Sequence, residues 1–338
     1  MEMKEFGTVA DGAKAHLYRL ENEHVRLDVT DYGAGVVSLV VKDAGIDVVQ
    51  GFDSVDGYIS QVPYMGASIG RVCNRIARGT FPLNGKVYHT PVNNGPNTLH
   101  GGLSGFNDKL WKCTEAPAGL QFEYLSRDGE EGFPGNLSVK VAYELLDDGI
   151  AFTYSGSADQ DTLFAMPNHM FFNLDGPRSL SALHHKITIP ASFYGHVDKD
   201  GLATGEFRKV DNTPFDFRSG MELGLHIGEE QEDLKLGSGY DHHFCVDGSG
   251  FRRMVSCEGA KVAMEIRSDL PGFQMYSANF LDGSYAGGKE GGRFPRRSAV
   301  CFETQYAPNA VNYEGQLKPI LKKGAVETHR TEYLFKAK

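Results

Sequence analysis

The sequence lacks the features that mark several large classes of protein. Its 338 residues include one Trp and five Cys, and no two Cys form a Cys-x-x-Cys pair that would indicate a zinc or redox site. No uncharged apolar run reaches the roughly 18 residues that a membrane span needs, and the first dozen residues carry charges instead of an apolar signal segment. We therefore expect a cytoplasmic protein with free thiols that does not associate with membranes.

Basic charge is also scarce. Lys and Arg total 34 against 44 Asp and Glu, which gives a net charge of −10, and the basic residues are scattered instead of forming a stripe. Nucleic acid is therefore not expected as a partner. The sequence has no phosphate-binding Gly-x-x-x-x-Gly-Lys-Ser/Thr loop, no His-Glu-x-x-His and no Gly-x-Ser-x-Gly. We predict that the protein works without a cofactor.

Two pairs of adjacent histidines are the remaining candidates for a metal site. They are His184-His185 and His242-His243. If these residues lie in strands, the two side chains of each pair point to opposite faces of the sheet. This argues against metal ligation by either pair, and we predict no metal site.

Glycine, proline and aromatic residues are abundant. There are 41 Gly and 14 Pro, and aromatic residues make up 11% of the chain, a mixture typical of many short strands joined by tight turns. Apolar and polar residues alternate over residues 25–30, and an apolar run follows at 36–41. Residues 137–145 and 150–154 also alternate, with the turn sequence Asp147-Asp148-Gly149 between them, which predicts a β-hairpin.

Further strands are predicted by short runs of the same kind. These runs cover residues 86–89, 120–125, 186–189, 251–256, 262–266, 273–277 and 332–335. Helical periodicity is limited to two short stretches, 55–61 and 220–225. No linker or repeat divides the chain, so we predict an all-β fold over residues 1–338, a large single-domain antiparallel β-sandwich with few short helices.

The apolar stretch 300–306 carries a carboxylate at its centre. In a strand, Glu303 and Gln305 point to one face, and Phe302 and Thr304 point to the other. The simplest interpretation is a glutamate that faces water, because Glu is rarely buried unless it is paired. The position of Glu303 alone therefore does not indicate catalysis.

Five other polar residues lie in glycine-rich or apolar surroundings: Asn74, Arg75, His100, His169 and Asp241. Each has an ordinary structural interpretation. Arg75 could form an ion pair, the histidines could be hydrogen-bonded core residues, and Asp241 could belong to a turn.

Taken in order along the chain, however, these segments resemble the aldose 1-epimerase family, the galactose mutarotases. The resemblance extends from about residue 33 to residue 335. It rests on the segments Gly70-Arg71-x-x-Asn74-Arg75-Ile76, Leu99-His100-Gly101-Gly102, Asn168-His169-x-x-Phe172-Asn173-Leu174, Tyr240-Asp241-His242 and Glu303-Thr304-Gln305.

The resemblance implies a fold, a reaction and a set of residue roles. The fold would be the galactose-mutarotase-like supersandwich, and the reaction would interconvert the α and β anomers of a hexose such as galactose or glucose. Glu303 would act as the base and His169 as the acid. The residues that bind the monosaccharide would be Asn74, Arg75, His100, Asp241 and Gln274. One base and one acid suffice for this reaction.

The chain departs from the family pattern beside His169. Met170 and Phe171 stand where the family usually has a small hydroxyl residue followed by Tyr, and Pro167 stands where Thr is usual. These changes bear on the orientation of His169 and on the shape of the sugar pocket. They keep open a second interpretation, a carbohydrate-binding or sugar-sensing module without turnover. A third is a glycosidase or lyase that uses Glu303 and Asp241 as paired carboxylates.

The sequence does not decide which aromatic residue, if any, stacks on the sugar. Sugar pockets commonly offer an aromatic face. A lone Trp is more often part of the core, so Trp111 is not our candidate for it, and Phe280 and Tyr306 lie nearer to the assigned residues. Arg71 is expected to be structural.

Overall fold

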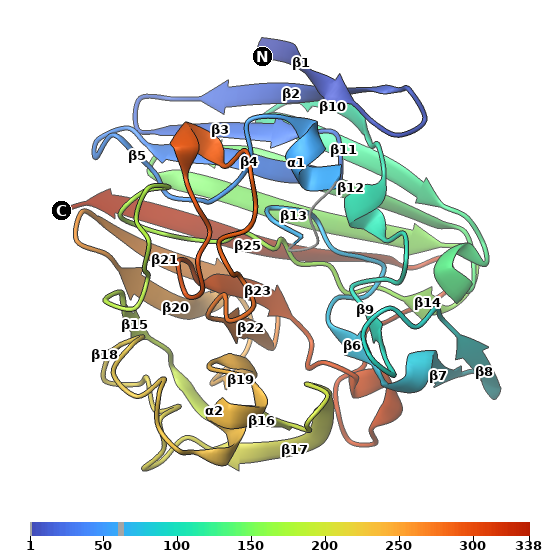
Figure 1. The fold of residues 1–338 in the computed structure, drawn as a ribbon. Helices are drawn as coiled ribbons and strands as arrows, with labels where there is room; N and C mark the ends of the chain where they lie inside the picture. Colours follow the sequence, from blue (N-terminus) through green and yellow to red (C-terminus); the bar gives the residue numbers. More distant parts are fainter. Residues whose placement is uncertain (1, 60–63) are drawn as a thin grey trace.

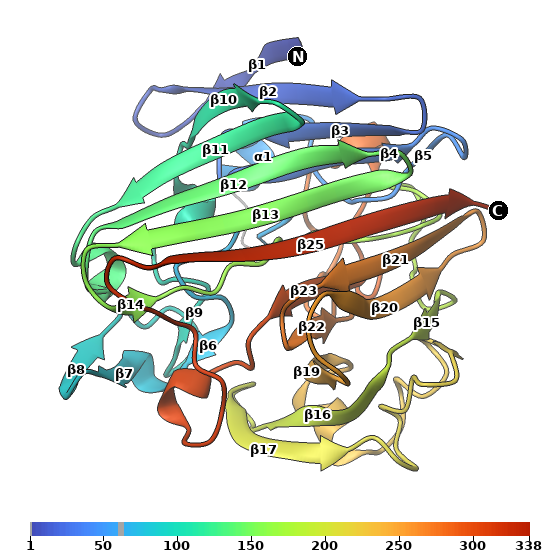
Figure 2. The ribbon, with the colours of Figure 1, turned by 180° about the vertical axis from the view of Figure 1, so that it is seen from behind.

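The computed structural model describes residues 2–59 and 64–338. Three antiparallel sheets dominate it (Figures 1 and 2). The first contains five strands in chain order: β1 (Glu2–Thr8), β2 (Lys14–Glu21), β3 (Val25–Thr30), β4 (Gly35–Val41) and β5 (Ile46–Asp47).

The second sheet crosses the middle of the molecule in both views (Figures 1 and 2). Its nine strands, in spatial order, are β10 (Lys112–Ala116), β11 (Gly119–Ser126), β12 (Leu137–Leu146), β13 (Gly149–Ala158), β25 (Val326–Ala337), β21 (Val262–Ser268), β20 (Arg252–Glu258), β15 (Lys186–Thr188) and β18 (Met221–Glu222). The C-terminal strand β25 pairs with β13 and β21, and therefore joins the two halves of this sheet.

The third sheet carries Glu303. Its spatial order is β17 (Ala203–Lys209), β16 (Ala191–Val197), β19 (Asp241–Val246), β22 (Gly272–Tyr276) and β23 (Cys301–Gln305). Three two-stranded pairs complete the strands of the described residues: β6 (Arg75–Ile76) with β9 (Thr98–Leu99), β7 (Thr80–Leu83) with β8 (Lys86–His89), and β14 (Thr162–Leu163) with β24 (Ile320–Leu321).

Helices contribute little. The described residues contain two α-helices, α1 (Val55–Ile59) and α2 (Glu232–Leu236), and short 3-10 turns at 77–79, 106–108, 130–132, 289–291 and 310–312. In the described part of the chain, no helix has the length and apolar character needed to cross a bilayer.

Most of the predicted elements are confirmed. The alternation at 25–30 and the apolar run at 36–41 are β3 and β4, and the predicted hairpin is β12 and β13 in register from Leu137–Ala158 to Leu146–Gly149. The helix predicted at 55–61 is α1 as far as Ile59, and its last two positions lie outside the described residues. The all-β class with few short helices is also confirmed.

The helix predicted at 220–225 is wrong. Met221 and Glu222 form the edge strand β18, which pairs with Ile187 and Lys186 of β15. Gly220 has a φ of +81°, a left-handed value that does not occur in a right-handed helix. The apolar spacing in this stretch instead reflects a buried Leu223, because the chain packs against the end of the nine-stranded sheet.

The main core joins all three sheets. Leu27 of β3 and Leu39 of β4 belong to the same buried cluster as Phe152 of β13, so the first sheet packs on the second. Phe302 of β23 contacts Phe172, which in turn contacts Tyr333 of β25. One face of the third sheet is thus buried against the second, which leaves the face of Glu303 for the site.

Arg71 is a structural residue, as expected. It is 2% exposed. Its guanidinium donates to the backbone oxygens of Pro134, Ser126 and Arg127 at 2.8 to 3.0 Å and to the hydroxyls of Ser126 and Thr162. These bonds tie the segment before Asn74 to the turn between β11 and β12.

We therefore expect Arg71→Met to lower the free energy of unfolding by about 3 kcal/mol or more, because two buried carbonyls and a part-buried one lose their donor. The matched control is Arg178→Met, since the Arg178 side chain is 76% exposed and its ion pair with Glu290 spans 3.7 Å. That change should stay within about 0.5 kcal/mol of wild type. Equal effects of the two substitutions in urea denaturation would show that Arg71 does not hold this part of the fold.

Candidate active site

Glu303 lies at the centre of β23 with its side chain on the face opposite Phe302. Its strand partner is Gln274 of β22, and Gln274 is paired in turn with His243 of β19. Directly opposite residues of an antiparallel pair point to the same face. A row of polar side chains therefore crosses three strands, and the water-facing interpretation of Glu303 is wrong, since the residue is only 2% exposed.

His169 lies next to Glu303 on an irregular segment. This segment is hydrogen-bonded to residues 66–67 on one side and to Val300 on the other. Its N–H donates to Ala67 O at 2.9 Å, and its own carbonyl accepts from Gly66. Three residues later, Phe172 and Val300 exchange both backbone hydrogen bonds, at 2.9 and 3.0 Å. Because Val300 directly precedes β23, this contact fixes the distance between the segment of His169 and the strand of Glu303.

The two residues predicted to be catalytic are in contact. His169 Nε2 lies 3.5 Å from Glu303 Oε1, with side chains 6% and 2% exposed. The second carboxylate oxygen of Glu303 and Nδ1 of His169 are buried without a hydrogen-bond partner among the described residues. Both groups thus have free hydrogen-bonding capacity.

His100 and Asn74 hold each other through reciprocal hydrogen bonds. The short strands β6 and β9 place them side by side; His100 N donates to Asn74 O at 3.1 Å, and Asn74 N donates to His100 Nδ1 at 3.2 Å. A backbone N–H can only donate, so Nδ1 is the acceptor and Nε2 of the neutral ring carries the hydrogen. The next residue must be glycine, because a Cβ on Gly101 would lie 1.9 Å from Gly70 O.

Arg75, Asp241 and Gln274 are also held by side-chain contacts. Arg75 Nε donates to Asn94 Oδ1 at 2.9 Å. Gln274 Nε2 donates to Asp241 Oδ1 at 2.7 Å. Asp241 begins β19, opposite Tyr276 of β22.

These residues surround a concave pocket of about 530 Å³, a size that suits a small molecule. Six of the seven predicted site residues line it: Asn74, Arg75, His100, His169, Asp241 and Glu303. Gln274 lines a smaller neighbouring cavity and donates to the pocket residue Asp241. The structure therefore places all seven predicted site residues in the pocket lining or in contact with it.

Burial shifts the pKa of Glu303, Asp241, His169 and His100 towards the neutral form of each group. Loss of water raises the pKa of Glu303 well above its ordinary value; the charge of Asp241 adds to this, and Arg75 opposes it. Burial lowers the pKa of His169 to about 4. It also lowers the pKa of His100 well below its ordinary value, with smaller contributions from His169 and Arg75.

The pocket contains residues that sequence reasoning missed. Tyr64 lies against His100 with ring centroids 4.7 Å apart. Asn94, which holds Arg75, lies in the polar turn Asn93-Asn94-Gly95-Pro96 before His100, and that turn was the available signal. Tyr64 has a left-handed φ of +59°, which a sequence pattern does not reveal.

Of the three aromatic residues considered for stacking on a sugar, one lines the pocket. Trp111 is core, 3% exposed, with its indole N–H donating to Phe106 O. Tyr306 hydrogen-bonds Glu327 and does not line the pocket. Phe280 does line it and is 61% exposed, so it is the one of the three whose face a ligand could reach.

Two groups of ionisable residues bring potential metal ligands within 4.8 Å of one another among the described residues: His100, His169 and Glu303, and Asp175, His184 and His185. In the first, the free nitrogen of His100 carries a hydrogen and cannot ligate. In the second, His185 Nε2 accepts from Leu174 N at 2.9 Å, so its Nδ1 carries the hydrogen. Neither set of donors fits a metal in these tautomers.

Only one of the two histidine pairs lies in a strand. His242 and His243 do point to opposite faces of β19, and His242 packs on Phe215. His184 and His185 lie outside the strands, with ring centroids 4.8 Å apart, so the prediction that they point to opposite faces of a sheet is wrong. The prediction assumed a strand at these two residues, whereas the chain turns there before β15 begins at Lys186.

Comparison with known proteins decides the family. The model of the family described as aldose 1-epimerase matches residues 16–334. The chain belongs to the aldose 1-epimerase family. It is 40% identical to a galactose mutarotase from Bos taurus over 98% of this chain and 97% of the relative, and 32% identical to an aldose 1-epimerase from Escherichia coli over 96% of each. An aldose epimerase homologue from C. elegans superimposes with a TM-score of 0.87 at 27% identity, covering 95% of this chain and 98% of that one.

The departures beside His169 now have a structural description. Met170 is buried in the main core and does not enter the pocket. Phe171 lines the pocket and stacks on His169, with ring centroids 5.0 Å apart and planes at 22°. The ring of Phe171 thus supports one face of the imidazole, without the hydroxyl that a Tyr would carry at position 171.

Asn94 gives a test of how Arg75 is held. We expect Asn94→Ala to raise KM for a hexose about fivefold with little change in kcat, because one hydrogen bond that orients the guanidinium is lost. Asn94→Asp retains an oxygen that accepts from Arg75 and should stay near wild type. A wild-type KM in the alanine variant, measured by steady-state kinetics, would show that Asn94 does not position Arg75.

Proposed function

We propose that this protein interconverts the α and β anomers of a hexose such as galactose or glucose, with Glu303 as the base and His169 as the acid. The observation that carries the proposal is the buried contact between these two side chains in a polar pocket, 3.5 Å apart. An isomerase of this kind needs one group that accepts a proton and one that gives a proton on the same substrate.

The proposed reaction has two halves. Glu303 takes the proton of the C1 hydroxyl, the bond between C1 and the ring oxygen breaks, and the ring oxygen takes a proton from His169. The carbonyl end then turns about the bond between C1 and C2. The ring oxygen attacks the other face of C1 and returns its proton to His169, while O1 regains a proton from Glu303. Protons and electrons balance without a further reactant.

The remaining pocket residues would orient the sugar. In the proposal, His100 offers its Nε2–H to the ring oxygen or a neighbouring oxygen, and Asn74 and Arg75 donate to hydroxyl groups. Asp241 accepts from them and is held by Gln274. Sugar hydroxyls both donate and accept, so fixed donors and acceptors around a ring select one orientation.

The catalytic pair is proposed to hold one proton in total. Burial disfavours both charged forms, so the empty pocket favours a neutral carboxyl and a neutral imidazole. Sugar hydroxyls that donate to Glu303 would favour its carboxylate, and the 3.5 Å contact lets the proton move to His169. Arg75 acts in the same direction on Glu303.

The proposal also covers the domain organisation of the chain and the compartment in which it works. The pocket takes side chains from the segment around residue 75 and from β23 near the other end of the chain, so we propose that the chain works as one domain. The five cysteines are free thiols, as expected in the reducing cytoplasm, where we place the reaction. The proposed partner is a monosaccharide.

The activity is tested by polarimetry with freshly dissolved α-galactose and α-glucose. We expect the protein to accelerate the change in optical rotation, and Glu303→Gln to lose at least about a hundredfold in rate, because the amide cannot act as a base. The control is Glu258→Gln, the same chemical change on β20 at a side chain 46% exposed and paired with Lys338.

The outcomes separate the alternatives. If the protein leaves both rates unchanged but binds sugar in calorimetry, it is a carbohydrate-binding module. If Glu303→Gln turns over at nearly the wild-type rate, the base lies elsewhere. Release of reducing sugar from a chromogenic glycoside would favour the glycosidase interpretation.

The pH dependence follows from the shared proton. Near pH 4, the pKa of His169, a second proton joins the pair and no base remains, so kcat/KM should fall on the acid side. Because the pKa of Glu303 is raised, the last proton leaves well above the ordinary carboxyl range, and only there should the alkaline fall occur. A bell-shaped profile of kcat/KM against pH is therefore expected. An alkaline fall in the ordinary carboxyl range would contradict the shared proton.

A further inference from the structure

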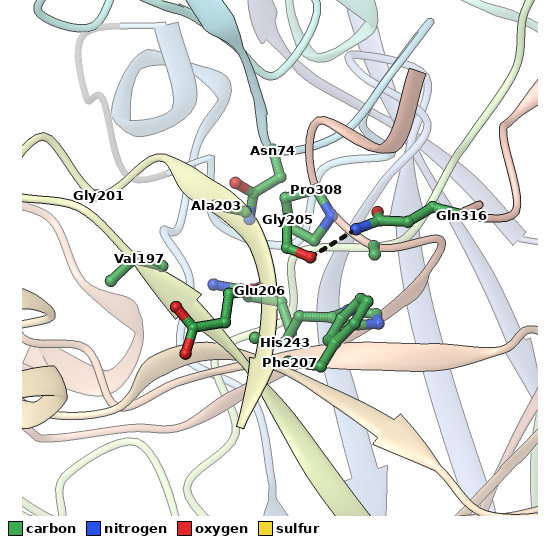
Figure 3. A pocket seen from close by; sticks show the side chains of 13 residues that line it. Asn74, Val197, Gly201, Ala203, Gly205, Glu206, Phe207, His243, Pro308 and Gln316 are labelled. Atoms are coloured by element: carbon green, nitrogen blue, oxygen red, sulfur yellow. Dashed lines mark hydrogen bonds between the residues drawn. The ribbon is translucent and has the colours of Figure 1, made fainter. Parts of the chain in front are cut away.

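A second, smaller cavity adjoins the sugar pocket. This inner cavity shares Asn74, Val197 and Gly201 with the pocket. Figure 3 shows its lining, with Asn74, His243 and Gln316 around it and a dashed line where Gln316 donates to Gly205 O at 3.0 Å. The volume of the inner cavity is about 10 Å³, compared with about 530 Å³ for the pocket. The inner cavity therefore has room for about one water molecule.

Two buried polar side chains of the third sheet line the inner cavity. His243 of β19 and Gln274 of β22 stand directly opposite each other, and Gln274 stands opposite Glu303 of β23. They are 4% and 3% exposed. Their side chains therefore lie next to each other on the face that carries the catalytic carboxylate.

Both side chains present an unsatisfied atom. His243 Nδ1 and Gln274 Oε1 are buried without a hydrogen-bond partner among the described residues. Buried polar atoms in folded proteins are nearly always paired, with protein or with an ordered water. A water that occupies a polar cavity typically makes two to four hydrogen bonds, and it can donate to one group and accept from another.

The imidazole ring of His243 is fixed in place and uncharged. A Cβ on Gly272 would lie 2.7 Å from His243 Nε2, so the ring occupies the space that the glycine leaves free. Burial lowers the pKa of His243 to about 3, which keeps the ring neutral near pH 7. A rigid, neutral ring suits a hydrogen-bonding role next to Asp241 without altering the charge of the pocket.

We propose that the inner cavity binds one water molecule that bridges His243 Nδ1 and Gln274 Oε1, and that His243 is thereby a positioning residue for sugar binding. The bridge fixes the far end of the Gln274 amide, whose near end donates to Asp241 Oδ1 at 2.7 Å. Asp241 is then held as an acceptor for a sugar hydroxyl. The inference rests on the proposed function, in which Asp241 contacts the substrate.

The kinetic test compares two substitutions of His243. His243→Leu fills similar space without a hydrogen-bonding group, whereas His243→Asn places an amide where it can meet the same water. We expect the leucine variant to raise KM about fivefold with kcat within about twofold, because the catalytic pair does not move while one orienting bond is lost. The asparagine variant should recover most of the affinity. An unchanged KM in His243→Leu, or equal defects in the two variants, would overturn the positioning role.

A second measurement does not depend on any variant. A crystal structure of the wild-type protein at near-atomic resolution should show a water within hydrogen-bonding distance of both His243 Nδ1 and Gln274 Oε1. If the cavity is dry or the two atoms bond only to protein, the bridge is overturned. A wild-type protein without mutarotase activity would contradict the proposed function, while the water peak would still decide the bridge.

Discussion

The buried contact between Glu303 and His169 is the constraint on which the rest of the site depends. A carboxyl group and an imidazole that are both removed from water favour their neutral forms. They become useful for catalysis only if they share a proton and if neighbouring groups stabilise the charges that appear during the reaction. Arg75 and Asp241 supply opposite charges near Glu303, so its pKa results from competing effects.

The fold provides this contact by fixing two unrelated segments to each other. Glu303 lies on a central position of β23, whose other face packs into the core through Phe302. His169 lies on an irregular segment, and an irregular segment needs its backbone satisfied elsewhere. The bonds to Ala67, Gly66 and Val300 do this, and they transmit the rigidity of the sheets to the imidazole. Asn74 and His100 achieve the same result with two reciprocal bonds.

The strands and the class of the fold could be predicted from sequence because one face of each strand is buried. Phe302 and Thr304 on one side and Glu303 and Gln305 on the other follow directly from the period of two, and so does the hairpin of β12 and β13. The stretch 220–225 failed because a two-residue edge strand is too short to show that period. The pairing of β13 with β25 joins residues near 150 to residues near 330, and no local pattern encodes it.

The residues of the site also divide into those that could be predicted from the sequence and those that could not. The resemblance to a family identified Glu303, His169 and the five proposed binding residues. Residue patterns alone left six of them with an ordinary structural interpretation and did not indicate Gln274. The places of Tyr64 and Asn94 in the pocket and the proposed role of His243 were missed, because they depend on a left-handed backbone, a side-chain hydrogen bond and a cavity, which exist only in three dimensions. For His184 and His185 the prediction of opposite side-chain directions was wrong, because it assumed a strand where the chain forms a turn.

The most direct test of the central claim is a crystal structure of the protein with a bound hexose. We predict that the C1 hydroxyl lies within hydrogen-bonding distance of the Glu303 carboxylate and that His169 Nε2 lies at the ring oxygen. A sugar bound in the pocket with C1 remote from both side chains would contradict it.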